Sequence, residues 1–353
     1  MPTTTTTTNG ANGFHHESTR PLSPGIFAPL PTFFLPGSED LDIPTFQKHA
    51  VTLAKAGVGI LIAGSMGEGH HLSQEERRQL ISSARAALDG AELSHVPIVA
   101  GTGAPTTRET HELTRQAAKA GADYAIVIAS GYFAGALAND RAALLDFFTE
   151  VADQSPIPVI IYNYPGAAGG IDLDSDLIED IAKKSSNICG VKLTCGNVGK
   201  LTRIAATTAV PSFEKQYPRK NKDAPFLVLG GFADFILPAA FARGHGAIVG
   251  LANVAPRTLH QLCELSFQAI NNPSLLPAAQ HLQDIVARAD RTIALAGIPG
   301  TKYLLSILHP GYPTAPRRPL RTLDEASGKR LWAEPNVRAL IEIESQLESE
   351  ATA

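Results

Sequence analysis

The stretch GVKLTCG, residues 190–196, follows Ile188 and Cys189 and completes a short apolar run that contains one lysine. We predict a strand over 188–193, because the residues on both sides of Lys192 are apolar and a glycine-containing segment ends the run. A parallel strand that is covered on both faces has this composition. Lys192 is therefore expected at the end of a buried strand, and its charge requires an explanation.

The same kind of apolar run occurs seven more times, and amphipathic segments lie between the runs. We predict further strands at 25–34, 58–63, 96–101, 123–129, 157–162, 225–230 and 245–249, and helices that include 42–57, 73–90, 107–121 and 172–186. Ser73 and Glu76 have the spacing of a capping box, which indicates a helix start. Eight alternating units predict an α/β fold of the TIM (β/α)8 barrel class. The alternative, a doubly wound sheet, usually carries a glycine-rich dinucleotide loop, which GTGAPT at 101–106 matches only partly.

The chain divides into three parts. The polar, threonine-rich tail over 1–24 is predicted to be disordered, because it cannot bury enough apolar surface. The barrel covers 25–254. The part over 255–353 holds the last barrel helix and a C-terminal helical appendage, with helices predicted at 255–270, 275–296, 298–308 and 336–349. The long connection over 211–225 lies at the N-terminal end of the seventh strand, away from the predicted site. We expect it either to take part in assembly or to have no specific role.

The bulk composition excludes several classes of function. The 353 residues are 44% hydrophobic and carry a formal net charge of -4, so we predict neither a nucleic-acid partner nor a membrane partner. The basic segment 218–223 is interpreted as a solvated loop. Three cysteines without paired spacing indicate a reducing compartment and no metal centre. No apolar run approaches the ~20 residues that span a bilayer, and the start resembles neither a signal peptide nor a presequence, so a cytoplasmic location is predicted.

Candidate catalytic groups lie where barrel strands end, since active sites of this fold are built there. Lys192 ends the sixth predicted strand and Tyr162 the fifth, while GSMGEG at 64–69 follows the second. Burial disfavours the charged form of an amine, and a neutral amine can attack a ketone to form a Schiff base. The Tyr162 phenol can transfer protons, and the Ser65 hydroxyl with the glycine-rich backbone around it suits a carboxylate. Glu68 is interpreted as ordering this turn rather than as a general base.

Each of these groups also has an ordinary explanation when it is taken alone. A lysine at a strand end can extend its ammonium group to water. Tyr162 can pack in the barrel rim, and 64–69 can be a plain strand-to-helix turn. His70 and His71 are adjacent, which is poor spacing for two ligands on one helix face, so no metal site is predicted.

Four motifs in a fixed order carry a resemblance to a known family. They are GSMGEGHHLSQEER at 64–77, GTGAPTTRET at 101–110, YNYPG at 162–166 and GVKLTCG at 190–196. With them, the chain resembles the dihydrodipicolinate synthase / N-acetylneuraminate lyase superfamily of Schiff-base aldolases over residues 25–325. The resemblance implies that Lys192 forms the imine, Tyr162 transfers protons and Ser65 binds the carboxylate of a small 2-oxo acid. It implies no cofactor beyond the covalent lysine imine.

The resemblance also implies an assembly and further residues that bind the substrate. Tyr132 matches a tyrosine that in this family reaches across a dimer interface to complete the proton relay, which implies a homodimer or a homotetramer. Gly250 and Leu251 match the position on the eighth strand that lines the site. Gly67 supplies backbone donors beside Ser65.

Two departures from the family pattern bear on the substrate. Met66 stands where many members have a second hydroxyl or an amide residue. Ala167 stands where dihydrodipicolinate synthases have an arginine that grips a substrate carboxylate, and alanine does not replace such a bidentate clamp. The reaction of lysine biosynthesis is therefore not expected.

The motifs GSMGE, YNYPG and KLTCGNVGKLTRI are most similar to those of fungal 2-keto-3-deoxy-L-galactonate aldolases. We therefore predict a carbon–carbon lyase that cleaves a 2-keto-3-deoxy sugar acid to pyruvate and an aldehyde. The alternatives are a 4-hydroxy-2-oxoglutarate aldolase and a pyruvate-dependent aldolase of specialised metabolism. A non-catalytic barrel that binds a 2-oxo acid is disfavoured, because such a relative is expected to have lost one of Lys192, Tyr162, Ser65 and Tyr132.

Overall fold

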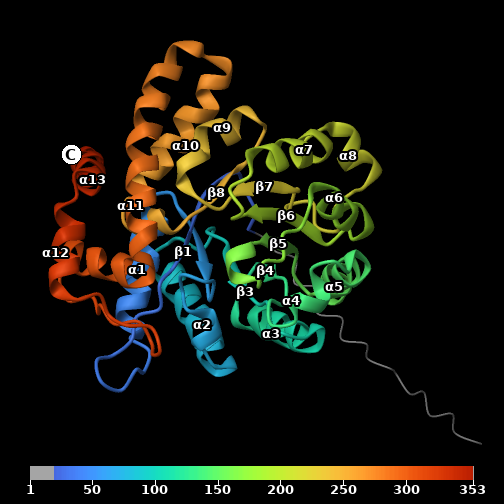
Figure 1. Ribbon diagram of the computed structural model, residues 1–353, viewed down its shortest axis with the longest axis horizontal. Helices are drawn as coiled ribbons and strands as arrows, with labels where there is room; N and C mark the ends of the chain where they lie inside the picture. The colour runs from blue at the N-terminus through green and yellow to red at the C-terminus, as the bar shows by residue number, and fades with distance from the viewer. Residues whose placement is uncertain (1–19, 353) are drawn as a thin grey trace, which may run out of the picture.

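The computed structural model describes residues 20–352 (Figure 1). Within that range eight parallel strands pair in sequential order and close into a barrel, which confirms the predicted TIM fold. The strands are β1 Gly25–Pro29, β2 Gly59–Ile62, β3 Ile98–Gly101, β4 Tyr124–Ile128, β5 Val159–Asn163, β6 Ile188–Leu193, β7 Leu227–Gly230 and β8 Gly246–Ile248. The first is shorter than predicted, since it ends at Pro29, which lacks the N–H that a ladder requires.

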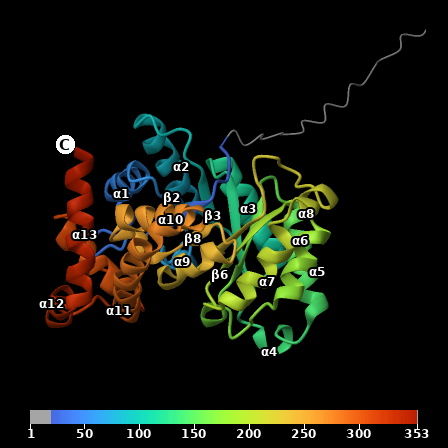
Figure 2. The ribbon, with the colours of Figure 1, turned by 90° about the horizontal axis from the view of Figure 1, so that it is seen from above.

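Helices surround the barrel (Figure 2). They are α1 Ile43–Lys55, α2 Gln74–Gly90, α3 Thr107–Ala120, α4 Ala134–Leu137, α5 Arg141–Gln154, α6 Ser175–Lys184, α7 Val198–Thr208, α8 Pro211–Gln216, α9 Ile236–Phe241 and α10 Pro256–Asn271. Short polar side chains start several of these helices, because they accept hydrogen bonds from backbone N–H groups of the first turn. The predicted capping box is present: the Ser73 N–H donates to the Glu76 carboxylate at 2.7 Å, and the Glu76 N–H donates to the Ser73 hydroxyl at 3.2 Å.

Buried side chains form two clusters that the barrel wall separates. Outward-facing strand residues such as Ile60, Val127 and Ile161 pack against the helices. Inward-facing residues such as Leu61, Ile126 and Leu229 fill the barrel. The filled interior leaves the strand ends as the place where a ligand can enter, as the fold predicts.

The C-terminal extension lies on one side of the barrel and consists of α11 Leu276–Leu308, α12 Glu325–Ala333 and α13 Pro335–Thr352 (Figures 1 and 2). The two helices predicted at 275–296 and 298–308 are the two halves of α11, which is kinked at Gly297 (φ 60°, ψ -152°). Glycine adopts this backbone conformation readily, and Pro299 beyond it cannot donate to the helical ladder. The sequence prediction missed α12.

Two other segments differ from the sequence predictions. Residues 20–24, assigned to the tail, contact the barrel: Leu22 is buried and its N–H donates to the Asp223 carbonyl at 2.9 Å. The remainder of the tail prediction, over 1–19, lies outside the described residues. The connection over 211–225 begins with the short helix α8, whose Phe213 is buried.

Candidate active site

Lys192 is directed into the barrel by an irregularity in its strand. In β6, Cys189 belongs to the interior cluster, whereas Val191 and Leu193 face the helices. Strict alternation from Cys189 would instead place Val191 and Leu193 inside the barrel and Lys192 outside it. The pairing between β5 and β6 shifts register at this point, since Val159 pairs with Ile188 and Ile160 pairs with Gly190. A bulge of this kind reverses the phase of the alternation, and the Lys192 side chain therefore points inward.

Gly190 makes the close pairing at the bulge possible. A Cβ atom at this position would lie 2.5 Å from the carbonyl oxygen of Leu227 on the neighbouring strand β7. Any larger side chain would push β6 and β7 apart. The glycine that precedes Val191 is thus part of what orients the lysine.

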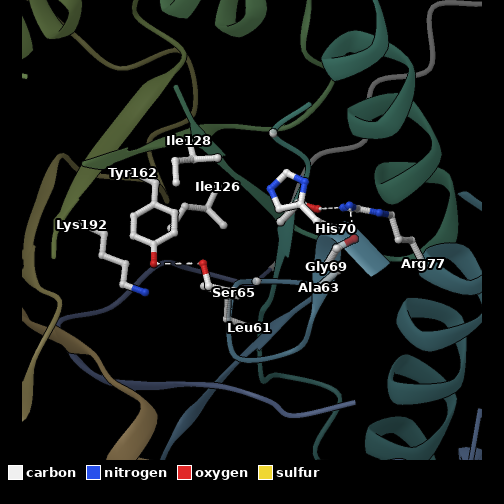
Figure 3. Close-up of a pocket in the computed structure, with 13 residues that line it drawn as sticks. Leu61, Ala63, Ser65, Gly69, His70, Arg77, Ile126, Ile128, Tyr162 and Lys192 are labelled. Carbon is white, nitrogen blue, oxygen red and sulfur yellow. Dashed lines mark hydrogen bonds between the residues drawn. The ribbon is translucent and has the colours of Figure 1, made fainter. Parts of the chain in front are cut away.

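Lys192, Tyr162 and Ser65 lie together at the barrel mouth (Figure 3). Tyr162 and Lys192 are register partners on β5 and β6, and the Lys192 ammonium nitrogen lies 4.3 Å from the centroid of the Tyr162 ring. The Tyr162 hydroxyl is 3.4 Å from Ser65 Oγ. Lys192 is 5% exposed and Tyr162 7%. A buried amine beside a phenol and a second hydroxyl is the arrangement that imine formation with assisted proton transfer needs.

These three residues separate two cavities. The smaller, of about 30 Å³, is shown in Figure 3; Ile126 and Ile128 of β4 form part of its apolar wall, and His70 and Arg77 contribute to the other side. The larger, of about 250 Å³, extends outward from Lys192 and also reaches Met66, Gly250 and Leu251. This volume is slightly below the roughly 300–1,000 Å³ of common small-molecule pockets, which suits a compact ligand.

The other predicted site residues lie elsewhere. Gly67 is buried under the turn, where its carbonyl accepts a hydrogen bond from the Thr32 hydroxyl at 2.7 Å. Ala167, in the short 3-10 helix Pro165–Ala167, is exposed and lines neither cavity. Tyr132 is 86% exposed and packs edge-on against Phe133, with ring centroids 5.1 Å apart. Its contribution to the site of a second chain stays a prediction.

The turn that carries Ser65 is strained and firmly anchored. Ala63 and Glu68 both have left-handed backbone conformations, with φ 56° and 55°. Such conformations of residues other than glycine cost energy and occur disproportionately at functional sites. The N–H of Glu68 donates to the Ser65 carbonyl at 3.1 Å, which closes the turn.

The Glu68 side chain ties this turn to the C-terminal extension. Its carboxylate is buried and accepts hydrogen bonds from the Lys302 ammonium at 2.6 Å and from the Arg317 N–H at 2.8 Å. Lys302 is itself fully buried within α11. Glu68 therefore orders the turn, as the sequence indicated, and does so through partners more than 230 positions away along the chain.

Sequence reasoning missed the part of the site that comes from the extension. The outer wall of the larger cavity is formed by α11, through Asp290, Ile293, Ala294, Gly297, Ile298 and Thr301. It also missed Thr194, just beyond β6, which lines the cavity and whose buried hydroxyl has no hydrogen-bond partner in the described part of the chain. An unpartnered buried hydroxyl at a cavity wall is available to a ligand. The one sequence signal for the α11 wall was the Gly-Ile-Pro-Gly punctuation at 297–300.

Burial shifts the pKa values of several groups around these cavities. It lowers the pKa of the Arg77 guanidinium, which donates to the Gly101 carbonyl at 2.9 Å and to the Gly69 carbonyl. It lowers the pKa of His70 as well, with the positive charge of Arg77 as a further cause. It raises the pKa of Tyr164, whose ring stacks on that of Tyr162 with centroids 5.8 Å apart.

Comparison with known proteins identifies the family. The model of the dihydrodipicolinate synthetase family matches residues 23–334. The chain belongs to this family. It is 41% identical to an L-threo-3-deoxy-hexylosonate aldolase of Aspergillus niger, over 93% of this chain and 98% of that protein. It is 44% identical to a protein of Emericella nidulans named "Probable 4-hydroxy-2-oxoglutarate aldolase, mitochondrial", over 94% of this chain and 99% of that one.

A solved structure supports the same family assignment. The crystal structure of a dihydrodipicolinate synthase family protein from Coccidioides immitis superposes with a TM-score of 0.76 at 34% identity. The match covers 93% of this chain and 99% of the other. The C-terminal extension is therefore part of the common architecture of this family member and the present chain.

Residues 20–352 contain neither a membrane-spanning helix nor a cluster of metal-binding side chains. In this range no helix is both long enough and apolar enough to cross a bilayer. The same range holds no group of three or more His, Cys, Asp or Glu side chains arranged to hold a metal ion.

Proposed function

We propose that the protein is a class I aldolase that cleaves 2-keto-3-deoxy-L-galactonate to pyruvate and L-glyceraldehyde through an imine on Lys192. The observation that carries the proposal is the buried Lys192 amine beside the Tyr162 phenol, with Ser65 Oγ 3.4 Å from that phenol. Membership of the family and the 41% identity to an L-threo-3-deoxy-hexylosonate aldolase support a sugar acid as the substrate.

The reaction sequence follows from the chemistry of the imine. The Lys192 amine adds to the C2 ketone, and water leaves to give a protonated imine. The Tyr162 phenol gives its proton to this departing water and, as a phenolate, then accepts the proton of the C4 hydroxyl; the C3–C4 bond breaks, and the electrons of that bond move into the imine to form an enamine. The aldehyde departs. Protonation of the enamine at C3 and addition of water then release pyruvate and restore the amine. The imine serves as the electron sink, so the proposed mechanism requires no cofactor.

A 4-hydroxy-2-oxoglutarate aldolase is the second candidate, because the Emericella nidulans protein with that name is 44% identical over most of both chains. Its substrate carries a second carboxylate at the end where the sugar acid carries hydroxyl groups. Among the described residues that line the larger cavity, Lys192 is the only cation, and it is used for the imine, so no cation is left for a second carboxylate. The sugar acid therefore fits the site better.

A cleavage assay separates the two candidates. Release of pyruvate from each substrate by the purified protein would be followed with lactate dehydrogenase and NADH. We expect kcat/KM at least about tenfold higher for the sugar acid, since a missing charge partner for a carboxylate costs about 1.4 kcal/mol or more. A preference for 4-hydroxy-2-oxoglutarate would select the second candidate. Cleavage of neither, together with no trapping of pyruvate, would favour a non-catalytic barrel.

The proposal includes a homo-oligomer in which Tyr132 completes the site of a partner chain. The exposed aromatic pair Tyr132 and Phe133 supports an interface at this surface. Mixed assemblies of Lys192→Met and Tyr132→Ala chains should regain activity that neither variant has alone, up to about a quarter of the wild-type value, because one site in each mixed dimer is complete. Failure to regain activity in assemblies shown to be mixed would contradict the shared site.

A cytoplasmic location is retained as a prediction. The Emericella nidulans protein is named mitochondrial. Fluorescence microscopy of the tagged full-length chain in a fungal cell would decide between the compartments.

A further inference from the structure

The two charged groups of the larger cavity come from different parts of the chain. Among the described residues that line it, Lys192 is contributed by β6, and Asp290 is contributed by α11 of the C-terminal extension. Asp290 is 7% exposed. The residues near it on α11 are mostly apolar and include Ile293, Ala294 and Ile298. A carboxyl group in such a wall is the polar feature that a ligand in the outer part of the cavity meets.

Asp290 has little to compensate its charge. Its carboxylate accepts hydrogen bonds from two backbone N–H groups, that of Ala233 at 3.0 Å and that of Asp234, and within residues 20–352 it takes part in no ion pair. Burial raises its pKa to about 7, and the neighbouring Asp234 contributes to the rise. The carboxyl group is therefore ready both to accept hydrogen bonds and, once protonated, to donate one. Burying such a group without a cation is costly.

Support of the neighbouring segment, the 3-10 helix Ala233–Phe235 and the start of α9, does not explain why this position is acidic. Holding the backbone of 233–237 requires only a neutral acceptor, and Gln283 on the same helix already supplies one. Its amide oxygen accepts from the Leu237 N–H at 2.8 Å, and its amide nitrogen donates to the Ala233 carbonyl at 2.9 Å. An asparagine at position 290 would complete the same support without an ionisable group. The carboxyl group of Asp290 is therefore better explained by a role toward a ligand in the cavity.

The two candidate substrates differ in what they would bring to this carboxyl group. The sugar acid ends in neutral hydroxyl groups, which donate hydrogen bonds to a carboxylate. A dicarboxylate would place a second negative charge there, with no cation to offset it. Asp290 would therefore attract the sugar acid and repel the dicarboxylate. A site gains selectivity from such a repulsive contact as well as from an attractive one.

We infer that Asp290 is a specificity-determining residue that binds the hydroxyl groups of the aldehyde half of the substrate and rejects an anionic aldehyde half. This inference rests on the proposed aldolase function. It gives the C-terminal extension a direct role in substrate choice, because Asp290 on α11 would contact the aldehyde half of the substrate, on the far side of the C3–C4 bond.

The test measures selectivity in the Asp290→Asn variant. Condensation of pyruvate with L-glyceraldehyde, which is neutral, would be compared with condensation of pyruvate with glyoxylate, which is an anion. We expect kcat/KM for glyceraldehyde to fall by about tenfold to a hundredfold, as for the loss of a charged hydrogen bond, and kcat/KM for glyoxylate to stay constant or rise. Asp284→Asn is the matched control, because Asp284 is an exposed acidic residue of the same helix that does not line the cavity. Its selectivity should equal that of the wild type.

Trapping of pyruvate on Lys192 with borohydride, carried out on every variant, keeps the two hypotheses apart. Unchanged selectivity in Asp290→Asn, or an equal loss with both aldehydes, would overturn the inference and leave Asp290 a structural residue. An equal selectivity change in Asp284→Asn would also overturn it, because general charge would then be the cause. If the wild type traps pyruvate but condenses it with neither aldehyde, both the proposed substrate class and this inference fail. If the wild type traps no pyruvate, the aldolase function itself fails.

Discussion

Replacing Lys192 by methionine is expected to lower kcat for cleavage of the sugar acid by about 10⁴-fold or more, because the variant has no amine to form the imine. Methionine is unbranched and apolar, so it can occupy the channel of the lysine side chain. Within residues 20–352 Lys192 forms no salt bridge, and the substitution therefore leaves no uncompensated charge behind. The variant should fold with at least wild-type stability, since it no longer buries an amine.

Borohydride reduction in the presence of pyruvate, followed by peptide mass spectrometry, checks this prediction directly. The wild type should carry a reduced pyruvyl adduct on Lys192, and Lys192→Met should carry none. Lys200→Met is the matched control: Lys200 is buried to a similar degree and pairs with Asp172, but it lines neither cavity. That variant should still be trapped at Lys192. An adduct on a different lysine of the wild type would show that the nucleophile has been assigned wrongly.

The sequence predicted those features that depend on short-range pattern. The alternation of apolar runs and amphipathic helices predicted the barrel, and the position of Lys192 and Tyr162 at strand ends predicted that they lie together, which the register of β5 and β6 confirms. Gly297 and Pro299 also predicted the break in α11, because glycine and proline change the conformation and hydrogen bonding of the backbone next to them.

The sequence did not predict features that depend on long-range contact. The phase shift at Gly190 that directs Lys192 inward exists only in the pairing of β5 with β6. Asp290 is one of several charged residues of an amphipathic helix, and nothing in the sequence separates it from the others. It lines the cavity only because α11 packs over the barrel mouth. Lys302 and Glu68 are 234 positions apart, so no local pattern relates them. The predicted role of Tyr132 requires a second chain, and its 86% exposed side chain alone does not say where that chain binds.

The buried pair of Glu68 and Lys302 is expected to give the largest effect on stability. Replacing Lys302 by methionine should lower the free energy of unfolding by about 3–5 kcal/mol, because it leaves the Glu68 carboxylate buried without its ammonium partner. Lys302 also donates to the Ala315 carbonyl at 3.1 Å and lies 4.7 Å from the centroid of the Phe34 ring, so further contacts would be lost. Denaturation in urea, followed by circular dichroism, measures the change.

Two further variants separate loss of the ion pair from loss of packing. Lys329→Met breaks an exposed pair with Glu325 on one helix, and it should change stability by no more than about 0.5 kcal/mol. Glu68→Gln combined with Lys302→Met should recover part of the loss, because the double variant buries no unpaired charge. Equal effects of Lys302→Met and Lys329→Met would contradict the assigned role of the buried pair.

Lys302→Met should also affect catalysis, through the position of Ser65. Glu68 closes the turn on the Ser65 carbonyl, and its left-handed backbone persists only while its surroundings hold it. Without Lys302 the turn is expected to relax and to move the Ser65 hydroxyl away from Tyr162, and misplacement of a catalytic group by about 1 Å can cost on the order of 10²-fold in rate. In folded Lys302→Met protein, kcat should therefore fall while pyruvate is still trapped on Lys192. A wild-type kcat in that variant would show that the extension holds the turn for stability alone.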